Sequence, residues 1–407
     1  MRGVWFALVL PVIAACTDAP TSVRPDAGGE RIVVTNDEAI LADRVQSTGG
    51  VDVPIIGTPG SEVLLRTTAD TSTPTFTLQA LVRAPSAAGK SLLATHVALR
   101  GEYAYVSYMT LGETALGAVE VFDINNPTNP RLVSQALLNK TDVAALDVDG
   151  NHVYLATAAH DGVFPEPAVL ERLQLSGGKL TAKSDRVGVP SFIATGVSVT
   201  GSRVFVTSGS GGAGVGGLST FSRSNLGLVR TDRFTDARAV SLPQGNFLAV
   251  SQGSPARLRV YDPNSLAMSA MVSLPGGSFP DAKSTVTLDG DWAFVSAGDG
   301  GVHVVDMVRG VQSGTLPSPP VPTGFPAANE LVTNAVTLVQ DLVLTADGAG
   351  GVSVAVSDHR RRRSGERVAV QALGRLALAG SANFVAANSK ALFVASGSGG
   401  LQILTVK

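Results

Sequence analysis

Side chains with oxygen or nitrogen ligands recur near the start of a repeated pattern of short apolar segments. Five precede or begin the first segment of a repeat, and two lie in Gly-rich loops: His96, Asp142, Asp236, Asn334 and Asn383, then Asp299 and Asp347. Carboxylate and amide oxygens suit calcium, and a bound metal could activate water for hydrolysis. The same residue types also hydrogen-bond neighbouring backbone where strands begin. Only their convergence in space would favour ligand binding.

Other patterns with catalytic or metal-binding chemistry are weak. The five histidines form no H-x-H or H-E-x-x-H pair and only one cysteine is present, which disfavours a zinc site. His160-Asp161 lies in a loop that could face a ligand, although such pairs are more often solvated. Residues 84–91, A-P-S-A-A-G-K-S, match a permissive phosphate-loop pattern. No helix-period segment follows them, so nucleotide binding is not expected.

The charge balance excludes a broad electrostatic role. The chain has 31 basic and 33 acidic residues and a formal net charge of -2, so no strong field for nucleic acid is expected. One dense basic cluster, His359 to Arg363 with Arg367, could meet anionic headgroups. A solvated loop is the more common role of such a cluster.

The N-terminus predicts export. A positive start precedes an apolar stretch at 4–13 that is short for a bilayer span. Residues 13–16, I-A-A-C, resemble the lipobox of bacterial lipoproteins. This resemblance implies that 1–15 is a signal peptide, that Cys16 is acylated, and that the lipid holds the protein at a membrane. By the same resemblance, Thr17 rather than Asp after the cysteine implies the outer membrane.

A polar segment follows the cysteine. Residues 16–74 are rich in Thr, Ala, Asp, Gly and Pro and carry three small apolar patches. We expect a tether, which as a flexible coil would reach about 40 Å. The apolar patches leave open that part of it packs on the domain that follows.

From residue 75 to 407 the chain repeats one unit, which is clearest at 281–316. It predicts four short strands: 284–288, a tight turn at Asp289-Gly290-Asp291, an aromatic and β-branched strand at 292–296, and, after a Gly-rich loop, strands at 302–307 and from 311. The first turn recurs near residues 101, 150, 201, 245, 290, 340 and 389. Spacings of 44 to 51 residues are typical of propeller blades. The sequence therefore predicts an all-β, seven-bladed β-propeller with about four antiparallel strands per blade.

The third strand of several units ends in Asp, which is most simply a cap on the following turn. Together with residues 123–130, D-I-N-N-P-T-N-P, the unit resembles the LVIVD repeat of bacterial surface and secreted β-propellers, over roughly 76–407. Units two and three depart from this pattern, since 169–173 and 218–222 lack the terminal Asp.

The last unit supplies only three strands, at 384–387, 391–396 and 401–406. Residues 76–83, F-T-L-Q-A-L-V-R, have strand character and precede the first unit. We predict that they add the fourth strand of blade seven, so that no sheet edge is left open by the ring.

Two classes of function are consistent with these features. The first is a lipid-anchored, noncatalytic scaffold of the cell envelope that needs no cofactor and binds protein or glycan through its loops. The LVIVD resemblance favours it. The alternative is a propeller hydrolase or lactonase with a metal, such as calcium, in the central channel, held by the Asp and Asn residues named above.

Overall fold

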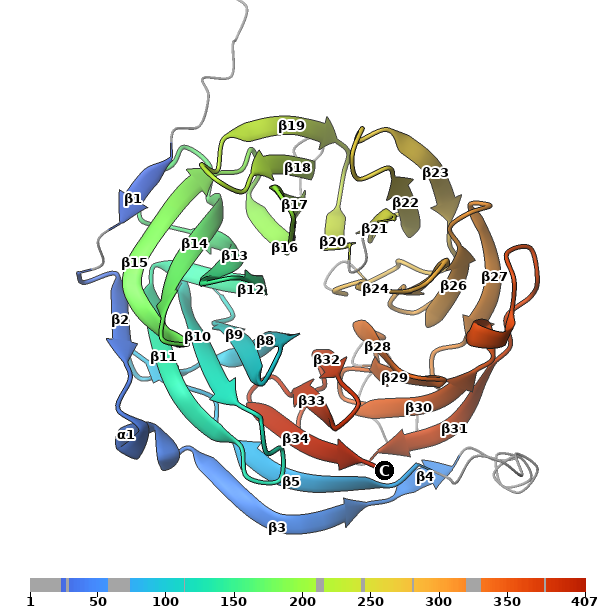
Figure 1. Ribbon diagram of the computed structural model, residues 1–407, viewed down its shortest axis with the longest axis horizontal. Coiled ribbons are helices and arrows are strands. Elements are labelled where there is room, and N and C mark those ends of the chain that lie inside the picture. The colour runs from blue at the N-terminus through green and yellow to red at the C-terminus, as the bar shows by residue number, and fades with distance from the viewer. Residues whose placement is uncertain are drawn as a thin grey trace, which may run out of the picture.

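The computed structural model describes residues 23–26, 29–57, 74–112, 114–209, 216–242, 246–279, 282–319, 331–376 and 378–407. Cys16 and the expected signal peptide, 1–15, lie outside the described residues. Within them, seven antiparallel sheets stand around a central axis, and the only α-helix is the five-residue α1 (Glu38–Ala42) (Figure 1). The predicted seven-bladed β-propeller is confirmed. No helix in the described ranges is long and apolar enough to cross a membrane.

Each blade consists of strands that follow one another along the chain and step outward from the channel. Blade one contains β8 (Leu93–Arg100), β9 (Tyr103–Met109), β10 (Leu116–Asp123) and β11 (Arg131–Asn139); blade two, β12 (Thr141–Asp149), β13 (His152–Ala159), β14 (Ala168–Ser176) and β15 (Lys179–Gly188). Blade three contains β16 (Ile193–Thr200), β17 (Arg203–Gly209), β18 (Gly217–Ser222) and β19 (Leu228–Arg233); blade four, β20 (Ala237–Ser241), β21 (Leu248–Gln252), β22 (Arg257–Tyr261) and β23 (Met268–Ser273).

The remaining blades follow the same order. Blade five contains β24 (Val286–Asp289), β25 (Trp292–Ser296), β26 (Val302–Asp306) and β27 (Val311–Leu316); blade six, β28 (Ala335–Val339), β29 (Leu342–Ala346), β30 (Val352–Ser357) and β31 (Val370–Leu376). Blade seven joins β32 (Phe384–Ala387), β33 (Ala391–Ala395) and β34 (Leu401–Val406) to β5 (Phe76–Val82). The segment that resembled a phosphate loop is a small hairpin, β6 (Ser86–Ala87) with β7 (Lys90–Ser91), and no helix follows it.

Blade five shows why the repeated residues form these elements. Gly290 takes a φ of +60° in the first turn, a conformation that costs glycine little. All five residues of β25 are buried, as expected for an aromatic and β-branched strand between neighbouring sheets. At the end of β26, the Asp306 carboxylate accepts hydrogen bonds from the backbone N–H groups of Val308 and Arg309, both at 3.1 Å. This confirms the predicted turn cap.

The ring closes as predicted. β5 pairs antiparallel with β34, from Phe76 opposite Val406 to Val82 opposite Leu401. Thr75 and Lys407 extend the pairing by exchanging two backbone hydrogen bonds of 2.9 and 3.0 Å. Blade seven therefore holds together the two ends of the repeated region.

The expected tether at 16–74 is wrong for its middle part. Residues 23–26 and 29–57, here called the belt, run around the outside of the ring and add a fifth strand to four blades (Figure 1). These strands are β1 (Arg24–Asp26) on β15, β2 (Ile32–Thr35) on β11, β3 (Val45–Val53) on β5 and β4 (Ile55–Gly57) on β31. The physical reason is that an extended segment gives a sheet edge its missing hydrogen-bond partners. Two of the three apolar patches noted in the sequence belong to the belt, and they bury Ile32 and Val53.

Two arginines of the belt neutralise carboxylates inside the propeller. Arg31 forms two hydrogen bonds with Glu171 of β14, and Arg44 forms two with Glu120 of β10. Both glutamate side chains are fully buried. A buried carboxylate that lost its partner would cost several kcal/mol. The belt is therefore part of the folded unit.

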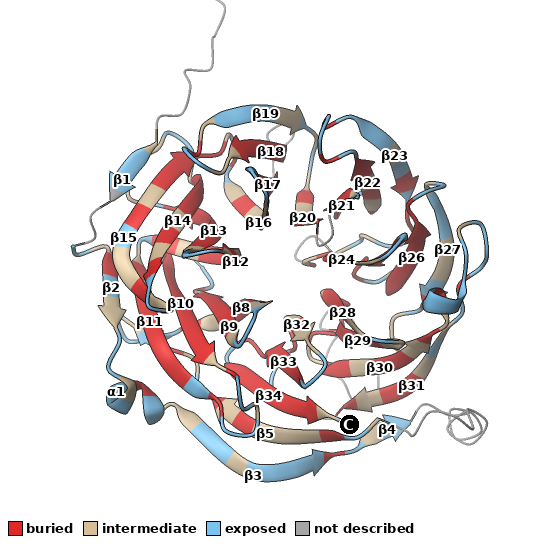
Figure 2. Ribbon diagram, in the orientation of Figure 1, coloured by how far each residue is buried: buried red, intermediate tan, exposed pale blue. Residues whose placement is uncertain are grey.

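The hydrophobic core lies between neighbouring blades rather than at the axis. One cluster joins blades seven and one, for example through Phe393, Ile403, Tyr108 and Phe122, and similar clusters fill the other interfaces. Figure 2 shows the buried residues concentrated on the middle strands, with exposed stretches on the outer strands β19, β23 and β27. The axis is left open.

Candidate functional site

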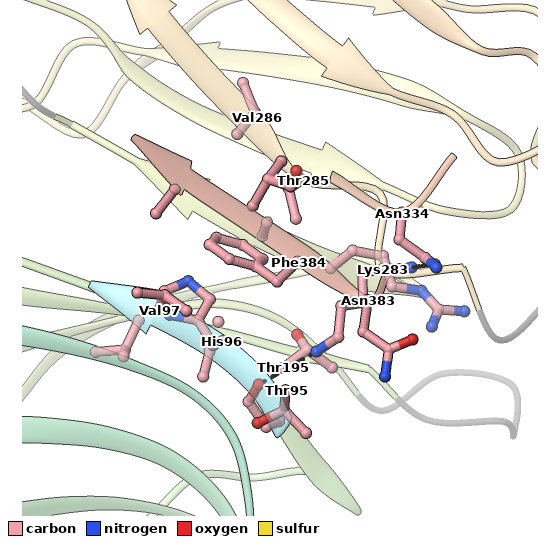
Figure 3. Close-up of a pocket in the computed structure, with 18 of the residues that line it drawn as sticks. Thr95, His96, Val97, Thr195, Lys283, Thr285, Val286, Asn334, Asn383 and Phe384 are labelled. Atoms are coloured by element: carbon pink, nitrogen blue, oxygen red, sulfur yellow. Dashed lines mark hydrogen bonds between the residues drawn. The ribbon is translucent and has the colours of Figure 1, made fainter. Parts of the chain in front are cut away.

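A cavity of about 630 Å³ lies where the innermost strands converge, and all seven blades contribute to its wall (Figure 3). Its volume falls in the range usual for small-molecule sites, about 300–1,000 Å³. Its polar side chains are hydroxyls, amides and nitrogen bases: Thr95, His96, Thr195, Arg238, Lys283, Thr285, Thr287, Asn334, Thr337 and Asn383. No carboxylate is among the described residues that line it.

β-Bulges position part of this wall. In the first strands of blades one to four, the pairing register skips one residue: Thr95, Ala144, Thr195 and Arg238. All four line the cavity. A bulge bends its strand and changes the direction of a side chain, which is why bulges are frequent beside binding sites.

The structure brings together three of the seven residues proposed from the sequence. His96, Asn334 and Asn383 line the cavity. The Asn334 amide oxygen accepts a hydrogen bond from the backbone N–H of Lys283 at 3.2 Å. The Asn383 amide nitrogen donates to the carbonyl of Ala94 at 3.3 Å. Both amides therefore also link one blade to the next.

Asp142 and Asp236 have structural partners instead. Asp142 accepts hydrogen bonds of 3.3 Å from both the backbone N–H and the hydroxyl of Thr110. Burial raises the pKa of Asp142. Asp236 accepts from the backbone N–H of Ser254 at 2.7 Å and pairs with Arg238 at 2.6 Å. Neither carboxylate lines the cavity.

Asp299 and Asp347 lie in Gly-rich loops and also serve neighbouring groups. Asp299 accepts from the backbone N–H of Ser278 at 3.0 Å. Asp347 is completely buried and accepts from the hydroxyls of Thr333, Thr345 and Ser353 at 2.8, 2.7 and 2.5 Å. Burial raises its pKa despite these hydrogen bonds. All four aspartates therefore accept hydrogen bonds from backbone N–H or hydroxyl groups of the protein, as the structural interpretation of these residues predicted.

Lys283 is a channel residue that sequence reasoning missed. Its ammonium donates a hydrogen bond of 3.3 Å to the carbonyl of Ala144 in blade two, which also lines the cavity. Burial and the nearby Arg238 lower the pKa of Lys283 to about 8. Its position in the repeat could have indicated it. Lys283 lies seven residues before the centre of the first turn of its unit, close to the equivalent positions of Asn334 and Asn383, which lie six residues before theirs.

His96 forms the apolar middle of the channel with Phe384. The two rings lie 4.0 Å apart between centroids and are tilted by 38°. Burial, followed by the charge of Lys283, lowers the pKa of His96 to about 3, so the imidazole is neutral at pH 7. Within the described part of the chain, its Nδ1 atom is buried and has no hydrogen-bond partner.

A second cavity of about 400 Å³ adjoins the first and shares His96 and Phe384 with it. Its far end carries Arg100, Asp147 and Asp149. Asp147 accepts from the backbone N–H groups of Val148 and Val199, both at 2.8 Å, and burial raises its pKa to about 6. The channel is therefore cationic at the end where the innermost strands begin and carries the carboxylates at the other.

The remaining polar motifs are engaged in ion pairs. In the basic cluster, Arg360 pairs with Asp289, Arg361 with Asp341 and Arg362 with Asp358, while His359 is buried against Asp289. In the other loop motif, Asp161 pairs with Arg186. These contacts favour structural roles for both loops.

Comparisons with known proteins support the fold. The chain is similar to the WD40 repeats of RRP9, with a TM-score of 0.57, 12% identity, and coverage of 80% of this chain and 99% of that one. It is also similar to BamB from Moraxella catarrhalis, with a TM-score of 0.51, 11% identity, and coverage of 89% and 99%. No family model and no curated protein sequence matches the chain. At these identities the similarity shows the β-propeller fold, and function must be argued from the chain's own residues.

Proposed function

We propose that this protein is a lipid-anchored β-propeller of the bacterial cell envelope that binds another protein without catalysis. The observation that carries this proposal is the outer edge of blades three, four and five, here called the bare arc. No described strand pairs with the outer edges of β19, β23 and β27. These strands expose apolar side chains by 44 to 54%: Leu228, Val229, Met268, Met271 and Val311.

The kind of partner is suggested by the other four blades. There, the equivalent edge is occupied by extended segments of the belt, all paired antiparallel. The bare arc offers a similar apolar surface and edges that no described strand pairs, although the Ser313 carbonyl of β27 accepts a 3.0 Å hydrogen bond from the backbone N–H of Val368. Such edges suit strand addition. A polypeptide supplies matching backbone N–H and C=O groups, so we favour a protein partner over a glycan.

The proposed lipid on Cys16 would hold the propeller close to the membrane. Only six residues separate Cys16 from Val23, where the described chain begins and the belt joins blade two. A fully extended segment of this length reaches about 25 Å. The anchor would therefore keep blade two near the bilayer surface, in place of the long tether expected from the sequence.

The alternative, a hydrolase or lactonase with a channel metal such as calcium, gains no support from the named aspartates. Asp142, Asp236, Asp299 and Asp347 bond other groups of the protein, and the cavity wall carries cations instead.

The binding proposal is tested by photo-crosslinking in the source cells. A photoreactive amino acid replaces Met271 or Leu228 on the bare arc, or, as a matched control, the equally exposed Val51 on β3 of the belt. We expect one discrete protein adduct from positions 228 and 271 and none from position 51. Equal adducts from all three positions, or none from the bare arc, would contradict the proposal.

The membrane proposal is tested separately. Replacing Cys16 by Ser should abolish labelling with an alkyne fatty acid and move the protein from the outer-membrane fraction to the soluble exported fraction. A wild-type protein that is soluble and unlabelled would rule out the anchor and leave the binding proposal standing.

A further inference from the structure

The central channel holds a lysine, Lys283, for which the described residues provide no counter-ion. Lys283 has three N–H donors, and the one hydrogen bond described for them is the 3.3 Å contact with Ala144. The charge that acts on it is another cation, Arg238, which pairs with Asp236, and Asp236 is not among the residues that line the cavity. An ammonium in such surroundings is costly unless an anion joins it. The folded protein therefore presents a cation with unused donors.

Further donors surround the same end of the cavity. Asn334 and Asn383 flank Lys283, and Thr95 and Thr195 come from the opposite blades (Figure 3). The amide nitrogens can donate to oxygen atoms of a ligand, whereas the two hydroxyls already donate to backbone carbonyls of the next blade at 2.9 and 2.8 Å. The described lining offers no carboxylate that would repel an anion.

Beyond these donors the wall becomes apolar. His96 and Phe384 stack at the middle of the channel, and Val97, Val197 and Val286 line the cavity beside them. A cavity of about 630 Å³ with one polar end and one apolar end suits a ligand of the same polarity. An inorganic ion would leave most of this surface without contact.

We propose that the channel binds a small organic anion with a flat apolar body, whose carboxylate lies at Lys283 and whose body packs against Phe384 and His96. This site is separate from the bare arc and does not depend on the protein partner proposed above. A neutral ligand would gain a hydrogen bond from Lys283 but no charge pairing, and a cationic ligand would be repelled. The carboxylate would accept hydrogen bonds from the ammonium and from the neighbouring amide donors.

Calorimetry with 2-naphthoate and its isosteric neutral amide, 2-naphthamide, tests the charge requirement on the purified full-length protein. We expect wild type to bind the acid at least about tenfold more tightly than the amide. In Lys283→Met the acid should lose this advantage, and Lys283→Arg should retain most of it. Lys390→Met, which removes an exposed lysine in a turn of blade seven, should behave as wild type.

The affinity should also depend on pH in a defined direction. Because the pKa of Lys283 is lowered to about 8, the ammonium is charged at pH 7 and loses its proton above pH 8. The other titratable groups described near it are the Arg238 guanidinium and the His96 imidazole, which is neutral between pH 7 and 9.5. Binding of 2-naphthoate should therefore weaken between pH 7 and 9.5, while binding of the amide stays constant.

Three results would overturn the proposal. They are equal affinity of wild type for acid and amide, a preference for the acid that survives in a folded Lys283→Met variant, and no detectable binding of the acid at millimolar concentration. Circular dichroism and the thermal midpoint establish that each variant is folded.

Discussion

The two sides of the ring differ in how the outer edges of their sheets are covered. On blades six, seven, one and two, here called the covered arc, the belt adds a fifth strand; on the bare arc the fourth strand is the last one described. β11 of the covered arc buries five consecutive residues, whereas β23 of the bare arc buries one of six. The comparison shows that burial of an outer strand is decided by a segment distant in sequence.

The third strands of the blades also differ between the two arcs, in the charge of one side chain. At one register position, opposite the fourth residue of the second strand, blades one and two have Glu120 and Glu171, which the belt arginines neutralise. Blade five has His303 at this position, and blade four has Arg259 opposite the third residue of β21. These two side chains contact residues of the propeller itself rather than of the belt. Arg259 lies 4.1 Å over the ring of Phe234, and His303 Nε2 is 2.9 Å from the Pro275 carbonyl.

Removing a belt arginine should have the largest effect. Arg44→Met leaves the Glu120 carboxylate buried without its cation, and we expect a loss of about 3–5 kcal/mol in the free energy of unfolding. The double variant Arg44→Met/Glu120→Gln should recover part of this loss, because no buried charge remains. Urea denaturation measures both. Arg363→Met, at an exposed arginine, is the control and should change stability by less than about 0.5 kcal/mol. An Arg44→Met variant as stable as wild type would show that the belt does not stabilise blade one.

Truncating one outer-strand residue on each arc gives an intermediate effect. Leu138 of β11 is buried and lies opposite Ile32 of β2 in the same sheet, so Leu138→Ala should cost about 2–4 kcal/mol. Met271 of β23 is half exposed, and Met271→Ala should cost less than about 0.5 kcal/mol. Similar losses at the two sites would mean that the bare arc is covered in solution.

Hydrogen exchange should reveal the smallest difference. Amides of β11 opposite β2 have belt partners, while amides on the outer edge of β23 have none among the described strands. We expect the latter to exchange at least about tenfold faster, a difference of ~1.4 kcal/mol in the free energy of opening. Equal protection factors would indicate an additional strand on β23.

The repeated fold could be predicted because each unit carries its own local signals. Gly290 marks a turn through its φ, and the buried run of β25 has strong strand propensity. Closure by 76–83 followed from the missing fourth strand of the last unit. These inferences needed only the pattern within a unit and the number of units.

The belt and the channel lysine could not be found in this way. In β3, apolar and polar residues do not alternate regularly and most residues are exposed, because the strand is stabilised by pairing with β5 rather than by a buried face. In the sequence, Glu120 is a single charged residue in an otherwise apolar strand, and its partner Arg44 lies 76 residues earlier in the chain. Lys283 precedes the first strand of its unit, where a lysine resembles an ordinary loop residue. Each depends on contacts between distant segments, which single-sequence patterns do not record.

Closure of blade seven also constrains when the protein can fold. Gln79 and Thr405, whose side chains hydrogen-bond at 2.9 Å across β5 and β34, are 326 residues apart. Contacts of this separation carry a high entropy of loop closure and form slowly. Among the described strands of the blades themselves, a ribosome makes β5 first and β34 last, so β5 waits through the synthesis of six complete blades before its partner exists. A truncation before residue 401 would therefore leave β5 without its partner β34, and the ring could not close.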